Sequence, residues 1–311
     1  MESNVQVYTS TGFKLLRHPK LILAWQEGYP IPNSLQVALT EKCNLNCKFC
    51  SIRNRERKYE IDLDELVLAT EKFISLGIKT IEITGGGEPL LYPNFNNYVD
   101  YLLRKNMKVG LITNGIGINK YAIGYLNWIR ISANVYDYKN QIEIPLNFHG
   151  TLGFSYVWTE GISSISTLFK IKEIALKNKV SYVRVVPDCS RDDIAEQNRF
   201  LEEFVNQLGT PFFLQGKRFK TSNGCYWGYL KPFLYADGFV YPCSSVVLNP
   251  DADKKFHESY RICHWSDAEK VWRQEPIKSL IKTSKCPHCV FTKQNEMLNY
   301  IGNKQRHEDF I

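Results

Sequence analysis

The sequence predicts an α/β fold built on a parallel sheet, followed by a small C-terminal domain of mixed α and β structure. Short apolar strands alternate with helices from about residue 34 to residue 208, which is typical of right-handed βα crossovers. The last third carries a hairpin signal and two pairs of cysteines instead. The composition is that of a globular protein, with 44% hydrophobic and 23% charged residues among 311.

Residues 1–33 form a short extension before the first strand. Apolar residues flank His18-Pro19, and Pro19 suits the first turn of a helix. We assign this extension no chemistry. The first residues lack the basic and apolar runs of a signal peptide, and no run of about 18 apolar residues occurs. We therefore expect a cytoplasmic protein without a membrane segment.

The alternating region contains six expected βα units. Asp62 and Glu65 resemble a helix-capping pair, and Gly77 is a typical helix stop. Six units are too few for a complete eight-stranded barrel, and chemistry in such barrels lies at the C-terminal ends of the strands. The expected strands are 35–40, 78–84, 109–113, 128–135, 153–158 and 182–187, and the expected helices are 62–77, 95–105, 164–178 and 192–208.

Three cysteines directly after the first strand form the most specific motif. Cys43, Cys47 and Cys50 have the spacing C-x3-C-x2-C. Three thiolates can hold three irons of a cubic [4Fe–4S] cluster and leave the fourth open, whereas an electron-transfer cluster usually takes four cysteines. A zinc site would need a fourth ligand, and no nearby histidine supplies one. Buried structural cysteines would be scattered instead.

This stretch resembles the radical S-adenosylmethionine (radical SAM) superfamily, whose members carry C-x3-C-x-aromatic-C after the first barrel strand. Phe49 fills the aromatic position, and residues 84–89, Thr-Gly-Gly-Gly-Glu-Pro, resemble the family's glycine-rich turn. The resemblance implies a partial (β/α)6 TIM-like barrel over residues 34–210. It also implies a SAM-binding [4Fe–4S] cluster and a low-potential electron donor of the flavodoxin or ferredoxin type.

The same resemblance assigns the expected SAM contacts. The glycine turn would face the methionyl amino group, and the end of the third strand would face the methionyl moiety. The end of the fourth strand would contact the ribose and carboxylate, and the ends of the fifth and sixth strands would contact the adenine. A glycine triplet is equally typical of a plain turn, apolar strand residues are equally typical of a barrel core, and the family often has Asp at position 134. The expected cofactor-binding residues are Phe49, Gly86, Gly87, Glu88, Thr113, Asn114, Ser132, Asn134, Gly161 and Val186.

The C-terminal region, residues 211–311, contains a second cysteine set around the hairpin signal Asp237-Gly238. It resembles the auxiliary-cluster domain called SPASM or, in its shorter form, twitch, and no cysteine follows the last one, which implies one auxiliary [4Fe–4S] cluster. A structural zinc ribbon is the alternative. Cys263 lies between the two pairs and could replace a ligand. The expected ligands are Cys225, Cys243, Cys286 and Cys289.

Cys189 is the one candidate catalytic side chain. It follows the sixth strand, at the barrel mouth, where a thiol could return a hydrogen atom to a substrate radical. A buried thiol that serves packing alone is the alternative.

The implied activity is reductive cleavage of SAM to a 5′-deoxyadenosyl radical, which takes hydrogen from a substrate. The net charge of +7 favours an acidic partner, although the short basic cluster Lys-Arg-Phe-Lys at 217–220 is equally typical of a solvated loop. We expect oxidation or rearrangement of a small carbohydrate- or nucleotide-like molecule. A peptide-modifying enzyme and a nonenzymatic iron–sulfur or zinc protein are the alternatives. Nucleic acid is possible but not indicated.

Overall fold

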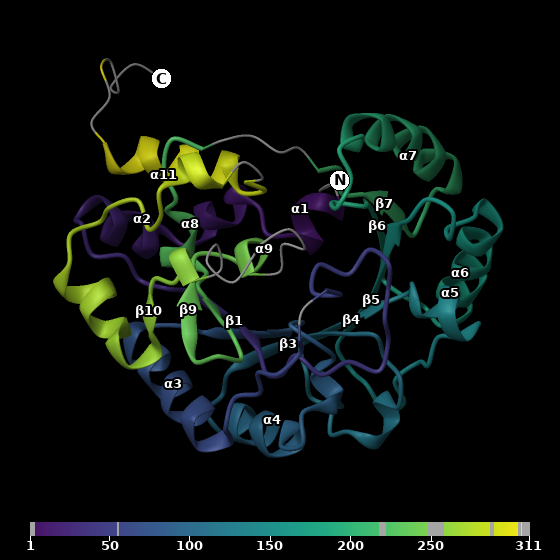
Figure 1. Cartoon of the computed structure of the whole chain (residues 1–311), viewed down its shortest axis with the longest axis horizontal. Helices are drawn as coiled ribbons and strands as arrows, with labels where there is room; N and C mark the ends of the chain where they lie inside the picture. The colour runs from purple at the N-terminus through teal and green to yellow at the C-terminus, as the bar shows by residue number, and fades with distance from the viewer. Residues whose placement is uncertain are drawn as a thin grey trace. The chain divides into compact units, whose positions relative to one another are not determined.

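The computed structural model describes residues 4–54, 56–217, 222–247, 258–286, 289–303 and 306. The chain forms two compact units (Figure 1). Unit 1 comprises residues 1–36, 64–79 and 219–311, and unit 2 comprises residues 37–63 and 80–218. Unit 1 therefore joins segments that are far apart in the sequence. Three residues of the basic cluster, 218–220, lie outside the described residues.

Unit 2 is built on parallel strands that follow one another in sequence. Each strand from β2 to β7 pairs in parallel with the next, and β7 is an edge strand, so this sheet is open. The predicted α/β class with a parallel sheet is confirmed, and β7 adds a strand to the six expected. The strands are β1 (Ser34–Ala38, where the two units divide), β2 (Thr80–Thr84), β3 (Lys108–Thr113), β4 (Trp128–Ser132), β5 (Thr151–Trp158), β6 (Tyr182–Pro187) and β7 (Phe212–Leu214).

Helices of unit 2 connect these strands and lie along their outer side in Figure 1. Apolar strand residues such as Ile129, Ile131 and Val183 are 0% exposed, so the outer face of the sheet is a dry core. The expected helices recur within a few residues, and α5 replaces the end of the fourth expected strand. The helical segments are η2 (Pro89–Leu91), α4 (Phe95–Arg104), η3 (Ile118–Lys120), α5 (Val135–Lys139), α6 (Ile165–Lys177) and α7 (Ile194–Leu208).

Unit 1 gathers the N-terminal extension and the C-terminal region. Its strands are two-residue or three-residue segments, β8 (Phe233–Leu234), β9 (Phe239–Tyr241) and β10 (Cys263–His264). Its helical segments are α1 (Asn4–Tyr8), η1 (Gly12–Arg17), α2 (Pro19–Gln26), α3 (Leu63–Leu76), α8 (Trp227–Leu230), α9 (Ser244–Val247), η4 (Trp265–Asp267), the π-helical turn η5 (Lys270–Gln274), η6 (Thr283–Lys285) and α11 (Thr292–Gly302).

A chain of buried aromatic rings holds unit 1 together. Trp25 of α2 meets Tyr229 of α8 at 5.8 Å between ring centroids, and Tyr229 meets Trp272 of η5 at 5.8 Å. Trp272 in turn meets Phe73 of α3 at 5.5 Å. Edge-to-face pairs of this kind stabilise a core beyond the area they bury. The N-terminal extension is thus part of the same core as the C-terminal region.

The hairpin expected at Asp237-Gly238 is present. Strands β8 and β9 are antiparallel, Gly238 has φ +79°, and the N–H of Phe239 donates to the Asp237 carboxylate at 3.0 Å. Glycine suits this position because a side chain would be strained at positive φ. In the described ranges, no helix combines the length and the apolar composition that a membrane span requires.

Candidate active site

The cysteine loop, defined here as residues 41–60, is closed at its base by backbone pairing. Thr40 and Glu60 form an antiparallel bridge, and the N–H of Glu41 donates to the Tyr59 carbonyl at 2.9 Å. The Tyr59 N–H in turn donates to the Glu41 carboxylate at 3.0 Å. Lys42 forms an ion pair with Glu60 at 3.0 Å. The loop that carries the three cysteines is therefore held at both of its ends.

Further hydrogen bonds fix the interior of the cysteine loop. The Cys50 N–H donates to the Cys47 carbonyl at 3.0 Å, which makes a tight turn between these two cysteines. Arg57 donates to the Leu45 carbonyl at 3.3 Å, and the N–H of Lys48 donates to the Tyr138 hydroxyl at 3.1 Å. A loop braced in this way holds its side chains at fixed positions without a regular element of its own.

The three thiols of the loop are half-buried and within electrostatic reach of one another. The pKa of the Cys47 thiol is raised to about 12, mainly by burial, with contributions from the neighbouring thiols of Cys50 and Cys43. The pKa of Cys43 is raised as well, mainly by burial, with Glu88 and Cys50 adding to it. Thiolates gathered in one place repel one another, and a bound metal centre offsets that repulsion. The donor set therefore fits an iron–sulfur cluster.

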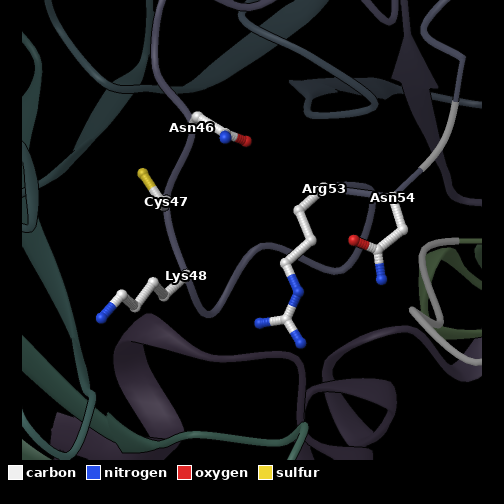
Figure 2. A pocket seen from close by; sticks show the side chains of 5 residues that line it. All are labelled: Asn46, Cys47, Lys48, Arg53 and Asn54. Atoms are coloured by element: carbon white, nitrogen blue, oxygen red, sulfur yellow. The ribbon is translucent and has the colours of Figure 1, made fainter.

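A hollow of about 340 Å³ opens on this loop (Figure 2). It is lined by Asn46, Cys47, Lys48, Arg53 and Asn54, so a thiol and two cationic side chains belong to its lining. Phe49, the aromatic residue of the motif, is half-buried. As the structure stands, the described part of the chain contains no group of three His, Cys, Asp or Glu side chains that could hold a single metal ion.

The glycine turn after β2 packs directly against the start of the cysteine loop. A Cβ atom on Gly87 would lie 2.2 Å from the Lys42 carbonyl oxygen and 2.5 Å from the Glu41 carbonyl carbon. The N–H of Glu88 donates to the same Lys42 carbonyl at 2.8 Å. Only glycine fits at position 87, because the neighbour is backbone that cannot move aside. Gly86, beside it, is buried.

Glu88 joins the ends of β2 and β3. Its side chain is 3% exposed and accepts hydrogen bonds from the Asn114 N–H at 2.7 Å, the Thr113 hydroxyl and the Leu90 N–H. Burial raises the pKa of the Glu88 carboxyl to about 6, against the lowering effect of these donors. Three of the expected cofactor residues are thus brought together, with Glu88 acting on the protein backbone.

Asn114 carries this network on to the cysteine loop. Its side-chain N–H donates to the Asn44 side chain at 2.7 Å, and its oxygen accepts from the Ile116 N–H at 3.0 Å. Asn44 lies directly after Cys43, so the end of β3 fixes the loop beside its first thiol. The sequence signal for Asn44 is its place inside the cysteine motif, which our sequence analysis did not use.

Ser132 and Asn134 follow β4 and differ in their surroundings. Ser132 is half-buried, whereas Asn134 is 1% exposed. The Asn134 side chain accepts from the Val157 N–H at 2.7 Å and donates to the Val157 carbonyl at 2.9 Å. It also donates to Asp137 at 3.1 Å. An amide donates through its nitrogen and accepts through its oxygen, so Asn134 pairs with both backbone groups of Val157, and its polar groups are occupied.

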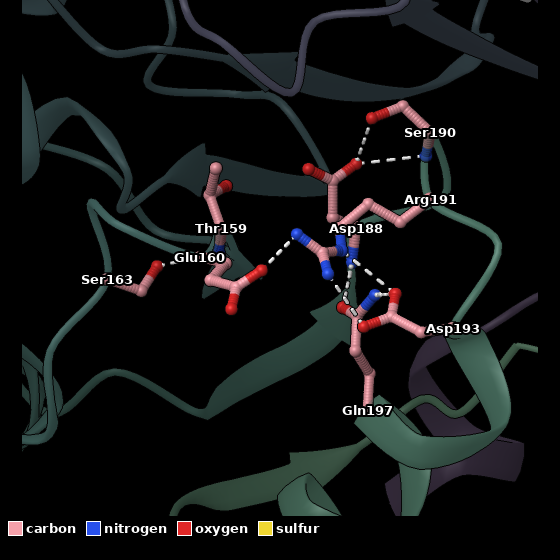
Figure 3. A network of polar contacts seen from close by, with 8 residues as sticks. All are labelled: Thr159, Glu160, Ser163, Asp188, Ser190, Arg191, Asp193 and Gln197. Carbon is pink, nitrogen blue, oxygen red and sulfur yellow. Dashed lines mark hydrogen bonds and ion pairs between the residues drawn. The ribbon is translucent and has the colours of Figure 1, made fainter.

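The loops after β5 and β6 are tied together by Arg191 (Figure 3). Arg191 donates to the Asp193 carboxylate at 2.8 Å through two nitrogens and pairs with Glu160. The neighbouring Asp188 carboxylate accepts from the N–H of Ser190 at 2.9 Å and from its hydroxyl at 2.7 Å. This network frames the segment that carries Cys189.

Three expected residues lie at this end of the sheet. Gly161 has φ +74°, and a Cβ atom there would meet open space. Val186 is buried at 6% exposure near the end of β6, while Cys189 is exposed. Although the residue is exposed, burial of its sulfur raises the pKa of the Cys189 thiol, with Lys217 and Arg184 opposing the rise.

The C-terminal cysteines form a second group, in unit 1. Burial raises the pKa of the Cys225 thiol, and the thiols of Cys243, Cys289 and Cys286 raise it further. The pKa of Cys243 is raised to about 12, mainly by burial, with Cys286 and Cys289 adding to the rise. All four expected ligands are therefore close neighbours, although they come from distant positions in the chain. Four thiolates suit an iron–sulfur cluster, although no three of these described thiols are arranged to hold a single metal ion.

Asn295 of α11 organises this second group, and sequence reasoning missed it. Its side-chain oxygen accepts from the N–H groups of Tyr226 and Trp227, both at 2.8 Å. Its nitrogen donates to the Cys289 sulfur at 3.6 Å. The side chain is 2% exposed. Asn295 thus holds the backbone next to Cys225 and the thiol of Cys289, a role that no local pattern indicates.

Cys263 lies apart from the four. It belongs to β10 and pairs with Val240 of β9. Burial raises its pKa to about 12, with smaller contributions from Asp267 and Glu275 rather than from other cysteines. Its surroundings are those of an isolated buried thiol.

Comparison with known proteins connects the site to a family. Residues 37–147 match the model of the Radical SAM superfamily. The subtilosin biosynthesis protein AlbA of Bacillus subtilis is 31% identical over 127 residues, which are 40% of this chain and 28% of that protein. A probable GTP 3′,8-cyclase of Methanococcus maripaludis is 35% identical over 92 residues, 29% of this chain and 31% of the cyclase. The chain thus matches about three tenths of the length of these relatives.

Solved structures share the fold at low sequence identity. Streptococcus suis SuiB bound to S-adenosylmethionine has a TM-score of 0.52 at 16% identity, with 84% of this chain and 74% of that chain covered. The structure of anSMEcpe with bound AdoMet and the Kp18Cys peptide has a TM-score of 0.53 at 14% identity, with 90% and 86% covered. The matched segment contains the cysteine loop, the glycine turn and the β3 and β4 ends, and the similarity to the radical SAM superfamily lies in this segment.

Proposed function

We propose that the protein binds a [4Fe–4S] cluster through Cys43, Cys47 and Cys50 and reductively cleaves SAM. The observation that carries the proposal is the set of three half-buried thiols on a loop whose ends and interior are fixed by hydrogen bonds. When bound, the cluster supplies the low-potential electron that splits SAM into methionine and a 5′-deoxyadenosyl radical, which takes a hydrogen atom from the substrate. A flavodoxin-type or ferredoxin-type donor would deliver that electron.

The chain's own residues would position SAM and keep water away. The Gly86-Gly87 turn offers backbone groups for the methionyl end, and Ser132 offers a hydroxyl for the ribose or carboxylate. Gly161 and Val186 would contact the adenine. The engaged side chains of Glu88 and Asn134 act as positioning residues, since their hydrogen bonds fix the strand ends. A preorganised and dry site limits side reactions of a carbon radical.

The four cysteines of unit 1 would hold an auxiliary [4Fe–4S] cluster. Their mutual effect on the pKa of Cys225 supports one shared site. The auxiliary cluster would accept an electron from the substrate radical or shape the substrate pocket.

For the substrate we favour a small acidic carbohydrate-like or nucleotide-like molecule, in keeping with the net charge of +7. A peptide substrate is the second candidate, because AlbA is a bacteriocin biosynthesis protein and the anSMEcpe structure contains a bound peptide.

Cys189 would serve as hydrogen donor if the product radical is quenched by the enzyme. Its thiol would lose a hydrogen atom to the carbon radical, and the thiyl radical would be restored by one electron from the low-potential donor and one proton. The position of Cys189, an exposed residue at the end of β6, supports this role. In deuterated buffer, Cys189→Ser should abolish deuterium incorporation into product while 5′-deoxyadenosine still forms. Unchanged incorporation would refute the role.

The test of the main proposal is anaerobic reconstitution with iron and sulfide, followed by dithionite and SAM. Wild type should form 5′-deoxyadenosine, and Cys47→Ala should form none. Cys263→Ala is the matched control, because this thiol lies apart from both cysteine groups and should retain cleavage. Equal cleavage by Cys47→Ala and wild type would refute the proposal.

A further inference from the structure

Two strands of unit 2 present arginines on the same face of the sheet, which we call the inner face. A Cβ atom on Gly110 would lie 2.1 Å from the Trp128 ring, and one on Gly153 would lie 2.1 Å from the Tyr182 ring. Gly110 pairs with Trp128, and Gly153 pairs with both Arg130 and Tyr182, so the two rings lie on one face of the sheet. Because side chains alternate along a strand, residues two positions further on point the same way. These residues are Arg130 and Arg184.

The inner face differs from the opposite one in burial and polarity. Arg130 and Ser132 are half-buried, whereas Ile129 and Ile131, which alternate with them along β4, are 0% exposed. In the strand register, Arg184 pairs with Ser155, which pairs with Ser132. The arginines of β4 and β6 thus lie two strands apart, on the half-buried face that also carries Ser132.

Both guanidinium groups have buried nitrogens without a partner. The Nε atoms of Arg130 and Arg184 are buried and donate no hydrogen bond to the described residues. Arg184 donates through Nη1 to the Gln215 side chain at 2.8 Å, a neutral acceptor. Arg130 lies 5.6 Å from the Trp128 ring centroid, a cation–π contact. Neither contact neutralises the positive charge.

Lys217, just after β7, adds a third positive charge to the group. The pKa of its half-buried ammonium is lowered to about 8, mainly by burial, and the charges of Arg184 and Arg130 add to this lowering. The pKa of Arg184 is lowered to about 9 by burial and by Arg130, and Glu82 opposes this shift. In the part of the chain that the structure describes, no carboxylate forms an ion pair with any of these three cations.

Half-buried cations gathered in this way destabilise the folded state unless a counterion is bound. A buried charge is normally paired, and leaving one unpaired costs several kcal/mol. Arginine forks match the two oxygens of a carboxylate or a phosphate, so a bound oxyanion would satisfy the free Nε atoms. The fold retains the three charges without an ion pair to a carboxylate of the described residues, and Glu82 favours the charged form of Arg184 only from a longer distance.

We propose that Arg130, Arg184 and Lys217 form an oxyanion site that binds a carboxylate or phosphate group of the substrate. Assigning this oxyanion to the substrate rests on the proposed function. Arg130 lies two positions before Ser132 on β4, about 7 Å at 3.3 Å per residue, whereas Arg184 is level with Ser132 in the strand register. The site therefore extends from the level of the residues that we assign to SAM to a deeper position on β4. It also explains why a protein of net charge +7 would select an acidic molecule.

Calorimetric titration of the full reconstituted chain with inorganic phosphate and with glutarate, at constant ionic strength, tests the site. We expect saturable binding of at least one probe by wild type, weakened at least tenfold in Arg184→Gln and in Arg130→Gln. The preferred probe indicates a phosphate or a carboxylate. Arg104→Gln is the matched control, because Arg104 lies on the surface of α4, where its side chain is 79% exposed. Absence of binding, or equal binding by Arg184→Gln and Arg104→Gln, would overturn the proposal.

A stability measurement separates a binding role from a structural one. Without an added anion, Arg184→Met should raise the melting temperature, since it removes an unpaired charge from a half-buried position and keeps the apolar bulk. A merely structural arginine would give a lower melting temperature, which would contradict the proposal.

Titration with SAM distinguishes the substrate oxyanion from the SAM carboxylate. The SAM affinities of Arg184→Gln and Arg104→Gln should agree within about twofold if Arg184 does not contact SAM. Loss of a charge pair with the SAM carboxylate would instead weaken binding by more than tenfold, and tenfold corresponds to about 1.4 kcal/mol. A selective loss of SAM affinity in Arg184→Gln would assign the site to SAM and overturn the proposal. If wild type binds phosphate but forms no 5′-deoxyadenosine, the proposed function fails while the oxyanion site stands.

Discussion

The two cysteine groups of this protein reach similar chemistry by different means. The loop of unit 2 holds three cysteines within eight residues, so their proximity follows from the chain itself. The group of unit 1 takes its four cysteines from positions between 225 and 289 and depends on a side chain of α11 to organise them. A ligand set that is contiguous in sequence needs only a braced loop, whereas a dispersed set needs the whole unit to be folded.

The largest expected difference between the groups is in SAM cleavage. Changing Cys43, Cys47 and Cys50 together to Ala should abolish 5′-deoxyadenosine formation, because no open-iron cluster can assemble. Changing Cys225 to Ala should reduce SAM cleavage far less, since this thiol belongs to the other group. Quantifying 5′-deoxyadenosine after dithionite reduction checks both variants. Equal losses would show that the two groups do not have separate roles.

The next largest expected difference between the two groups is in metal content. Reconstituted wild type should hold about eight irons, and the loop triple variant about four, at four irons per cluster. Iron and zinc analysis of the purified proteins checks this. Stoichiometric zinc and no iron in the triple variant would show that the unit 1 group is a zinc ribbon.

Asn295 and Asn114, which form hydrogen bonds to the two cysteine groups, should differ in how much they contribute to the free energy of unfolding. Asn295→Ala leaves two buried backbone N–H groups without an acceptor and should lower the free energy of unfolding by about 3 kcal/mol, with loss of about four irons. Asn114→Ala removes one contact to the cysteine loop and should cost about 1 kcal/mol. Urea unfolding of the metal-free proteins, with iron analysis after reconstitution, measures both. A larger cost for Asn114→Ala would reverse the comparison.

The smallest expected effect is on alkaline stability of the metal-free chain. The folded-state pKa of Cys243 is about 12, above its ordinary value of 9.0, so the folded state holds this proton when the unfolded state has lost it. Stability should therefore fall as pH rises above 9. Cys243→Ser should weaken this fall relative to wild type, as measured by melting temperature between pH 8 and 10. Parallel curves for the two proteins would contradict the shift.

Several elements were predictable because their signals are local. The alternation of strands and helices, the stop at Gly77 and the hairpin at Asp237-Gly238 all follow from short-range patterns. The parallel sheet is confirmed, and residues 37–147 match the radical SAM superfamily as expected. Strand β7 was missed because three residues are too few to show a period. The assignments of individual residues to SAM and to the clusters stay predictions.

By itself, the sequence determined the fold class, the cysteine motif and the glycine turn, because each depends on the order and spacing of neighbouring residues. Only the tertiary structure decided that the Asn134 amide pairs with Val157 of β5 and that Asn295 joins the segments of Cys225 and Cys289. It also placed Cys263 away from the other cysteines. It also decided that Arg130, Arg184 and Lys217 share one charged region. Such contacts join residues far apart in the chain, and their partners depend on strand order and register, which no local pattern encodes.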